Sequence, residues 1–175
     1  MNHTKITQMI LLFGSLSLLP PLGSASVLEG KTVGVSDGDT VTIIDNEKSQ
    51  HKVRISGIDA PEKGQPFGIK SKENLSKFIY GKHVRVEWTK IDRYNRIIGK
   101  IRIKCNETDC PSINDAGLMQ INSGYAWHYK QYASEQTQDD RIAYAKSESL
   151  ARSRRIGLWQ DNDPLAPWDF RRLKK

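Results

Sequence analysis

Short runs of alternating apolar and polar residues constrain the fold of this chain more than any other feature. The runs cover 31–35, 39–45, 51–58, 83–88 and 96–103, and turn-like segments such as "NEKS" and "DRYN" separate them. This period of two residues is typical of half-buried β-strands. The first three runs follow each other too closely for βαβ crossovers. The pattern therefore favours a small, strongly curved β-barrel over a parallel sheet.

Three helices are expected beside these five strands. The spacing predicts one helix near 67–80, a short one over 115–127 that ends at Gly124, and a longer one from Thr137 to about Arg155. Thr137 is a good N-cap, and acidic residues follow it in the first turn. The fold class is therefore mainly β with α-helices added (α+β).

Residues 1–25 have the composition of a signal peptide. Lys5 precedes the apolar stretch "MILLFGSLSLLPPLG", and the small residues of "GSAS" suit cleavage near Ala25 or Ser26. The stretch is short for a membrane span. We expect a secreted or periplasmic protein with no stable membrane association after processing, and a monomer is the default. Retention of the segment as an anchor is the alternative.

Net charge indicates the kind of partner. The chain carries a formal charge of +7 at pH 7, which suits a polyanion such as nucleic acid or an anionic membrane, or simply keeps the protein in solution. After a domain over 27–160, residues 161–175 form a basic C-terminal tail. Two interpretations of the wider basic C-terminus, from Arg141 to Lys175, stay open: non-specific contact with phosphates, or a solvated tail.

The two cysteines, Cys105 and Cys110, lie in "CNETDC". In an exported chain such a close pair favours a disulfide that closes a small loop. Two thiolates without a second pair are a poor zinc signature.

Acids and arginines gather at strand ends and turns, in "DGDT", "RISGIDAPE" and "DRYNR". Each motif alone has an ordinary structural interpretation, as a tight turn, a solvated arginine or a helix cap. Together they match the needs of phosphodiester hydrolysis: a cation on the phosphate, positive donors, and a base for water. Oxygen ligands suit Ca²⁺ or Mg²⁺, and the planar fork of arginine grips phosphoryl oxygens. The candidate residues are Asp39, Asp59, Glu62, Arg54 and Arg96.

Five motifs in order, "DGDT", "VRISGIDAPE", "DRYNRIIGKI", "GYAW.Y..Y" and "ESLAR..RIGLW", resemble the staphylococcal nuclease (thermonuclease) family. The similarity runs from about Thr32 to Trp159. It implies an OB-fold, a five-stranded β-barrel with three helices. It also implies Ca²⁺-dependent cleavage of DNA and RNA to 3′-phosphorylated products.

The resemblance also implies roles for single residues. Asp39 and Asp59 match the family's metal carboxylates, with the backbone carbonyl of Ala60 as a further ligand. Ala60 stands where threonine is familiar in the family, and a carbonyl ligand survives that change. Asn95 stands where glycine is familiar and should preserve its turn.

The remaining matches concern the substrate. Arg54 and Arg96 would bind the scissile phosphate and stabilise its transition state. Glu62 would act as the general base or orient the attacking water. Tyr94 and Tyr132 resemble positions that contact the nucleotide, by stacking or hydrogen bonding.

Other polar and aromatic residues are expected to be structural. Asp37 is predicted to shape its turn, or to support the metal ligands without binding the metal itself. His128 and Trp127 are predicted to pack. The main alternative to an enzyme is a non-catalytic OB-fold module that binds nucleic acid without cutting it. Retention of all five acids and arginines favours catalysis.

Overall fold

The computed structural model describes residues 25–104 and 113–174. The predicted signal peptide, up to residue 24, and the predicted Cys105–Cys110 disulfide lie outside these ranges. Among the described residues, no helix is long and apolar enough to cross a membrane.

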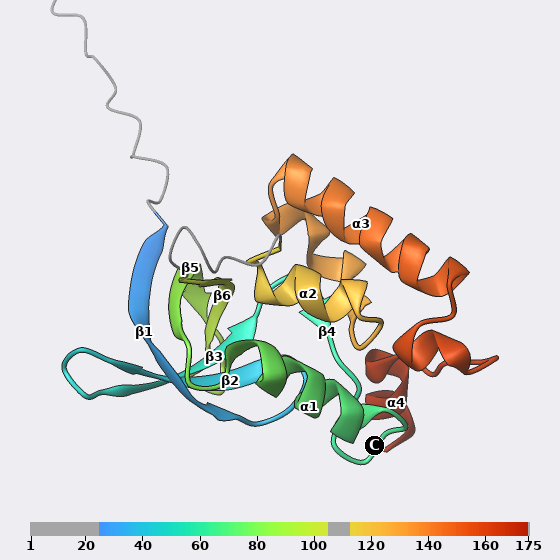
Figure 1. Ribbon diagram of the computed structural model, residues 1–175, viewed down its shortest axis with the longest axis horizontal. Helices are drawn as coiled ribbons and strands as arrows, with labels where there is room; N and C mark the ends of the chain where they lie inside the picture. Colours follow the sequence, from blue (N-terminus) through green and yellow to red (C-terminus); the bar gives the residue numbers. More distant parts are fainter. Residues whose placement is uncertain (1–24, 105–112, 175) are drawn as a thin grey trace, which may run out of the picture.

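Five strands close into a barrel in the order β1-β2-β3-β6-β5 (Figure 1). Neighbouring strands are antiparallel except for β3 and β6, which are parallel. The barrel and its helices confirm the predicted OB-type α+β fold. The strands are β1 (Ser26–Val35), β2 (Thr40–Asp45), β3 (Gln50–Ile55), β5 (His83–Ile91) and β6 (Ile97–Ile103).

The run over 51–58 is not the single strand that its alternation predicts. β3 ends at Ile55, and a two-residue strand, β4 (Ile58–Asp59), pairs instead with β7 (Trp127–His128). Gly57 lies between them with φ 75°, a conformation that glycine adopts without strain. Its carbonyl accepts a hydrogen bond from the N–H of Tyr129 (2.9 Å). This break turns the chain out of the barrel just before Asp59.

The three expected helices are present, and a fourth follows them. They are α1 (Gly68–Ile79), α2 (Ala116–Asn122), α3 (Gln138–Ser153) and α4 (Pro167–Leu173), with short 3₁₀ turns over Lys130–Glu135 and Gly157–Gln160. Thr137 caps α3, since its hydroxyl accepts from the N–H of Asp140 (3.2 Å).

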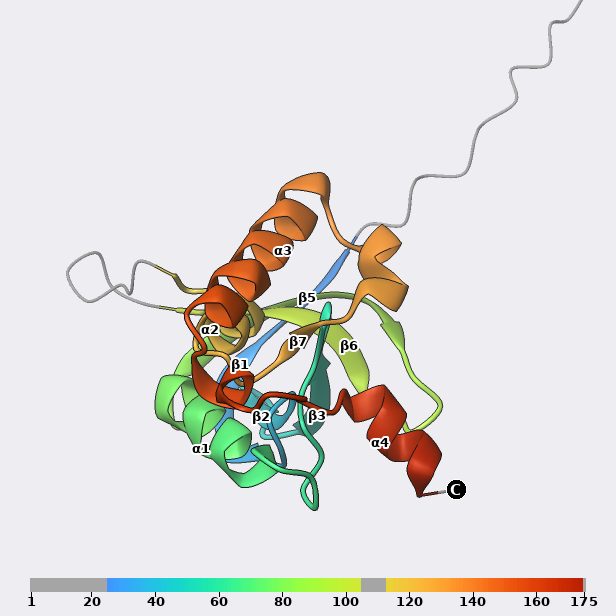
Figure 2. The same cartoon turned by 90° about the vertical axis from the view of Figure 1, so that its right-hand side faces the viewer.

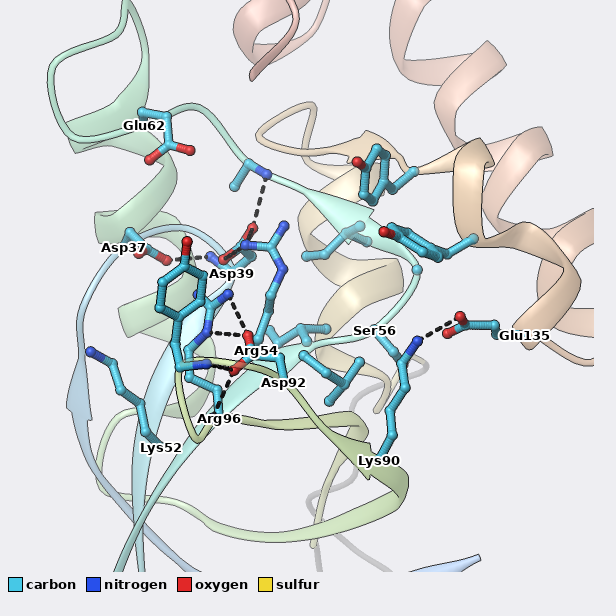
Figure 3. Close-up of a pocket in the computed structure, with 18 of the residues that line it drawn as sticks. Asp37, Asp39, Lys52, Arg54, Ser56, Glu62, Lys90, Asp92, Arg96 and Glu135 are labelled. Atoms are coloured by element: carbon cyan, nitrogen blue, oxygen red, sulfur yellow. Dashed lines mark hydrogen bonds and ion pairs between the residues drawn. The ribbon is translucent and has the colours of Figure 1, made fainter. Parts of the chain in front are cut away.

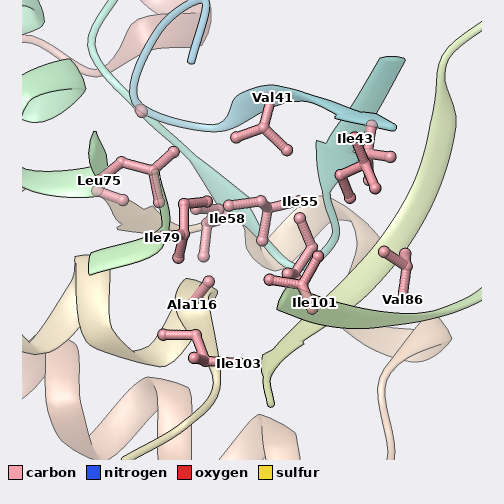
Figure 4. Close-up of a cluster of buried hydrophobic side chains, with 14 of the residues drawn as sticks. Val41, Ile43, Ile55, Ile58, Leu75, Ile79, Val86, Ile101, Ile103 and Ala116 are labelled. Atoms are coloured by element: carbon pink, nitrogen blue, oxygen red, sulfur yellow. The ribbon is translucent and has the colours of Figure 1, made fainter. Parts of the chain in front are cut away.

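The alternating apolar residues of the strands fill the barrel and contact α1 and α2 (Figure 4). Val41, Val53, Leu75 and Ile101 are fully buried. Each such side chain contributes about 1.5–3 kcal/mol through removal from water. The core thus fixes the ends of β2 and β3, from which the polar motifs project.

A second apolar cluster holds the C-terminal segment. It contains Trp127, Ala151, Leu158, Trp159 and Ala166, with Phe67 and Trp168 packed against it. Trp168, on α4, stacks on Tyr129 with ring centroids 5.5 Å apart and an interplanar angle of 16°. The solvated-tail interpretation of the basic C-terminus is therefore wrong for α4, which packs against the domain.

Candidate active site

An open pocket lies beside the barrel, where β2, β3 and the turn between β5 and β6 come together (Figure 3). Four of the five candidate acids and arginines line this pocket. The fifth, Asp59, lies next to it and contacts Arg54. The sequence-predicted residues in its lining are Asp39, Arg54, Ala60, Glu62, Tyr94, Arg96 and Tyr132.

Asp39 precedes β2 and is almost completely buried, with 3% of its surface exposed. Its carboxylate accepts hydrogen bonds from the hydroxyl of Thr40 (2.8 Å) and the N–H of Ala60 (3.3 Å). Burial raises the pKa of Asp39, Arg54 opposes that change, and the nearby Asp37 adds to it. Asp37 shapes the turn as expected, because its Oδ1 accepts from the N–H of Asp39 (3.1 Å).

Arg54 joins the two aspartates that the family resemblance assigns to metal binding. Its Nη1 donates to Oδ1 of Asp39 (3.1 Å), and its Nη2 donates to Oδ1 of Asp59 (2.7 Å). Burial alone would lower the pKa of Arg54, but the charges of Asp39 and Asp59 outweigh it and raise that pKa. Two buried carboxylates thus converge on one guanidinium.

Glu62 lies on the loop after β4, nearer the surface than the two aspartates. Its side chain is 38% exposed, and its backbone N–H donates to Oε1 of Gln65 (3.1 Å). Pro61 precedes it, where the chain leaves the small β4–β7 sheet. A carboxylate in this position has access to water as well as to the pocket.

Arg171 reaches the same carboxylates from α4, and it lies outside every motif that predicted the site. Its Nη1 donates to Oε1 of Glu62 (2.7 Å) and its Nη2 to Oδ2 of Asp59 (2.7 Å). These hydrogen bonds raise the pKa of Arg171. A helical signal was present around it: Pro167 at the first helical position, Asp169 in the first turn and arginines in the last.

Arg96 enters the pocket from the turn between β5 and β6. Asp92 orients it, because Oδ2 of Asp92 accepts from Nε of Arg96 (2.8 Å) and Oδ1 accepts from its backbone N–H (2.9 Å). Burial alone would raise the pKa of Asp92, but the hydrogen bonds from Arg96 outweigh it and lower that pKa. Tyr94 is 67% exposed, with the guanidinium of Arg96 over its ring at 5.5 Å.

Aromatic rings form a second side of the pocket. Tyr129 and Tyr132 pack edge to face with centroids 5.1 Å apart, and Nζ of Lys90 lies 5.1 Å from the centre of the Tyr132 ring. Burial and the charge of Asp59 raise the pKa of Tyr129. Tyr129, which the sequence analysis did not assign to substrate, also lines the pocket.

A buried amide supports the turn that carries Asp39. Gln120, on α2, donates from Nε2 to the carbonyls of Gly38 (2.8 Å) and Ser71 (3.1 Å). A Cβ at Gly38 would lie 2.7 Å from Cβ of Ala60 and 1.8 Å from Oγ of Ser71. Only glycine therefore lets this turn approach α1 so closely.

His128 and Trp127 are buried, as expected for packing residues. Nε2 of His128 is within hydrogen-bond distance of Oε1 of Gln136 (2.8 Å), and Trp127 packs edge to face on Trp159. Neither residue belongs to the lining of the pocket.

The donor chemistry of the pocket fits a hard cation. Among the described residues, no group of three or more Asp, Glu, His or Cys side chains is clustered for metal binding. Asp39 and Asp59 nevertheless share the guanidinium of Arg54, and Ala60 follows Asp59 directly. The N–H of Ala60 donates to Oδ2 of Asp39, so this residue lies beside both carboxylates. Two carboxylates are oxygen ligands of the type that Ca²⁺ or Mg²⁺ takes together with a backbone carbonyl and water.

The comparisons with known proteins agree with this geometry. A sequence profile described as "Staphylococcal nuclease homologue" matches residues 52–161. The chain is 38% identical over 168 residues to an "Uncharacterized endonuclease" of Haemophilus influenzae, covering 94% of this chain and 86% of the relative. The chain belongs to the staphylococcal nuclease family.

Two other relatives are less similar in sequence. A "Micrococcal nuclease" of Shigella flexneri is 33% identical, over 83% of this chain and 82% of its own. The "Staphylococcal-like nuclease CAN1" of Arabidopsis thaliana is 33% identical over 83% of this chain but only 41% of its own. Membership in this nuclease family supports a nuclease hydrolase that acts on nucleic acid. Asp39 and Arg171 fall on either side of the profile match.

Proposed function

We propose that this protein is a metal-dependent endonuclease that hydrolyses phosphodiester bonds in DNA and RNA to 3′-phosphorylated products. The observation that supports this most is the convergence of Asp39 and Asp59 on Arg54, in a pocket that also contains Arg96 and Glu62. A binding module has no need of two buried carboxylates beside its phosphate-binding arginines, because they repel a polyanion.

Asp39, Asp59 and the carbonyl of Ala60 would hold the cation, for which Ca²⁺ is our first choice. When bound, it supplies Lewis-acid polarisation of a phosphoryl oxygen and lowers the pKa of bound water.

The side chains supply positioning and charge. Arg54 and Arg96 donate to the non-bridging oxygens of the scissile phosphate, and stabilise the charge that develops there. Glu62 accepts a proton from the attacking water or orients it, since its carboxylate is both solvent-accessible and next to the pocket. Tyr94 and Tyr132 are exposed and would contact nucleotide bases.

We further propose export through the N-terminal segment, with the processed protein secreted or periplasmic. The apolar stretch and the small residues before Ser26 support this. Fractionation of cells and the N-terminal sequence of the recovered protein test it. Full-length protein recovered in the cytoplasm would contradict export.

Digestion of DNA and RNA in Ca²⁺, in Mg²⁺ and in EDTA tests the activity, with end-group analysis of the products. We expect cleavage with Ca²⁺, none with EDTA, and 3′-phosphate ends. A protein that binds nucleic acid but cuts it with neither metal would instead be the non-catalytic OB-fold module. Cleavage in EDTA would contradict the metal requirement alone.

A further inference from the structure

α4 places a guanidinium on the carboxylates of the proposed metal site. Both cartoon views show α4 beside the segment that follows β4 (Figures 1 and 2). Nη1 of Arg171 contacts Oδ1 of Asp59 (3.2 Å) and Oε1 of Glu62 (2.7 Å), and Nη2 contacts Oδ2 of Asp59 (2.7 Å). One arginine from near the C-terminus thus binds two acids that lie more than a hundred residues earlier.

Contacts other than those of Arg171 hold α4 in place. Trp168 stacks on Tyr129 and packs edge to face on Trp127 with centroids 5.5 Å apart. Just before the helix, the carbonyl of Leu165 accepts from Nε2 of Gln65 (2.6 Å). The position of α4 therefore does not depend on the ion pairs of Arg171 alone.

Both carboxylate oxygens of Asp59 accept hydrogen bonds from a guanidinium. Oδ1 accepts from both Arg54 and Arg171, and Oδ2 accepts from Arg171. The Asp59 side chain is fully buried, whereas Arg171 is 38% exposed. A cation bound by Asp59 takes one of these oxygens and repels the guanidinium. Arg171 can then move into water, while Arg54, only 18% exposed, stays between the aspartates.

We propose that Arg171 is an internal competitor of the divalent cation, so that binding of the cation at Asp59 displaces the guanidinium of Arg171. This inference rests on the metal site of the proposed function. We call the protein closed when Arg171 is paired with Asp59. Because the cation competes for the same atoms, its apparent affinity falls as the fraction of closed molecules rises. If Arg171 is paired with Asp59 in about nine molecules of ten, removal of its guanidinium tightens cation binding about tenfold.

A purely structural role for Arg171 predicts something else. If its ion pairs only fastened α4, their loss would lower stability and leave cation binding equal or weaker. The two roles therefore differ in the sign of the effect on affinity.

Calorimetric titration of Ca²⁺ into the full chain distinguishes them. We compare wild type with Arg171→Gln and with Arg172→Gln, the matched control. Arg172 is the next residue of α4, carries the same charge and pairs with Asp169 at 3.1 Å on the surface. Urea unfolding of each protein establishes that it is folded. Trp168→Ala is a second variant, which loosens α4 without touching the carboxylates.

We expect Arg171→Gln to bind Ca²⁺ about tenfold more tightly than wild type. Trp168→Ala should also bind Ca²⁺ more tightly, and Arg172→Gln should bind it as wild type does. Equal or weaker binding by Arg171→Gln, or equal tightening by both arginine variants, would overturn the competition while leaving the metal site intact. Absence of Ca²⁺ binding in every protein would overturn the metal site as well.

Discussion

Arg54 lies between Asp39 and Asp59 and donates one terminal nitrogen to each, at 3.1 and 2.7 Å. β3 supplies the arginine, the residue before β2 supplies the first aspartate, and β4 supplies the second. Because the buried core fixes these strands, three side chains from three separate elements meet with little freedom.

Replacing Arg54 should lower the stability of the folded protein. Arg54→Met leaves two buried carboxylates with fewer counter-charges, so we expect a loss of about 3 kcal/mol in the free energy of unfolding. Ca²⁺ should restore part of it, because the cation supplies the missing charge. Urea unfolding with and without Ca²⁺ measures both effects. Arg85→Met, at an exposed pair on β5, is the control and should cost less than about 1 kcal/mol.

Arg96→Ala should affect turnover more than binding. The proposed role of Arg96 is in the transition state, so we expect kcat to fall about 10²–10³-fold with a small change in KM. Steady-state cleavage of a short DNA measures this, and Arg102→Ala, on the outer face of β6, should behave as wild type. A rise in KM as large as the fall in kcat would mean that Arg96 only clamps the substrate.

Gly38→Ala should damage the metal site without unfolding the barrel. The new Cβ would press against Ala60 and Ser71, at a cost of about 1–3 kcal/mol, and push the turn of Asp39 out of place. We expect weaker Ca²⁺ binding and slower cleavage. Gly34→Ala is the matched control on β1, since its Cβ would meet Thr42 at an ordinary 3.4 Å. Equal behaviour of the two variants would contradict the close approach at Gly38.

Tyr144 should make stability depend on alkaline pH. Its buried hydroxyl donates to Asp115 (2.9 Å), and burial, followed by the charge of Asp115, raises its pKa well above 10. The raised pKa means that the contribution of Tyr144 is complete below about pH 10 and is lost as pH rises toward the folded-state pKa.

Tyr144→Phe tests this dependence. We expect it to be less stable than wild type by about 1 kcal/mol at pH 8, with the difference narrowing above about pH 10. Unfolding free energies from pH 8 to 11 give the two curves. Parallel curves across that range would contradict the assignment, because the two proteins differ only at residue 144.

Local patterns in the sequence predicted most of the barrel. Alternation located the five strands, and Thr137 with its acidic first turn located the start of α3. The break at Gly57 was missed, because alternation continues through "RISGI" and only the pairing of β4 with β7 interrupts the strand. Short paired strands depend on tertiary contacts that no local pattern contains.

The residues of the site also divide into those that local motifs predict and those that depend on tertiary contacts. The motifs predicted residues that do come together: Asp39 and Arg54 line the pocket, and Asp59 is hydrogen-bonded to Arg54. Arg171 could not be placed by them, because its position depends on the stacking of Trp168 on Tyr129, two residues on separate elements. The ion pairs with Asp59 and Glu62 are likewise visible only after folding.

We propose above that Asp39 holds a cation required for phosphodiester cleavage. The most direct test is the rate of plasmid DNA cleavage over a Ca²⁺ titration by wild type, Asp39→Asn and Asp139→Asn. Asp139 is an exposed acid in the first turn of α3 and serves as the control. We predict Ca²⁺-dependent cleavage by wild type and Asp139→Asn, and a loss of more than about 100-fold in Asp39→Asn. Cleavage by Asp39→Asn at the wild-type rate and Ca²⁺ dependence would contradict the account.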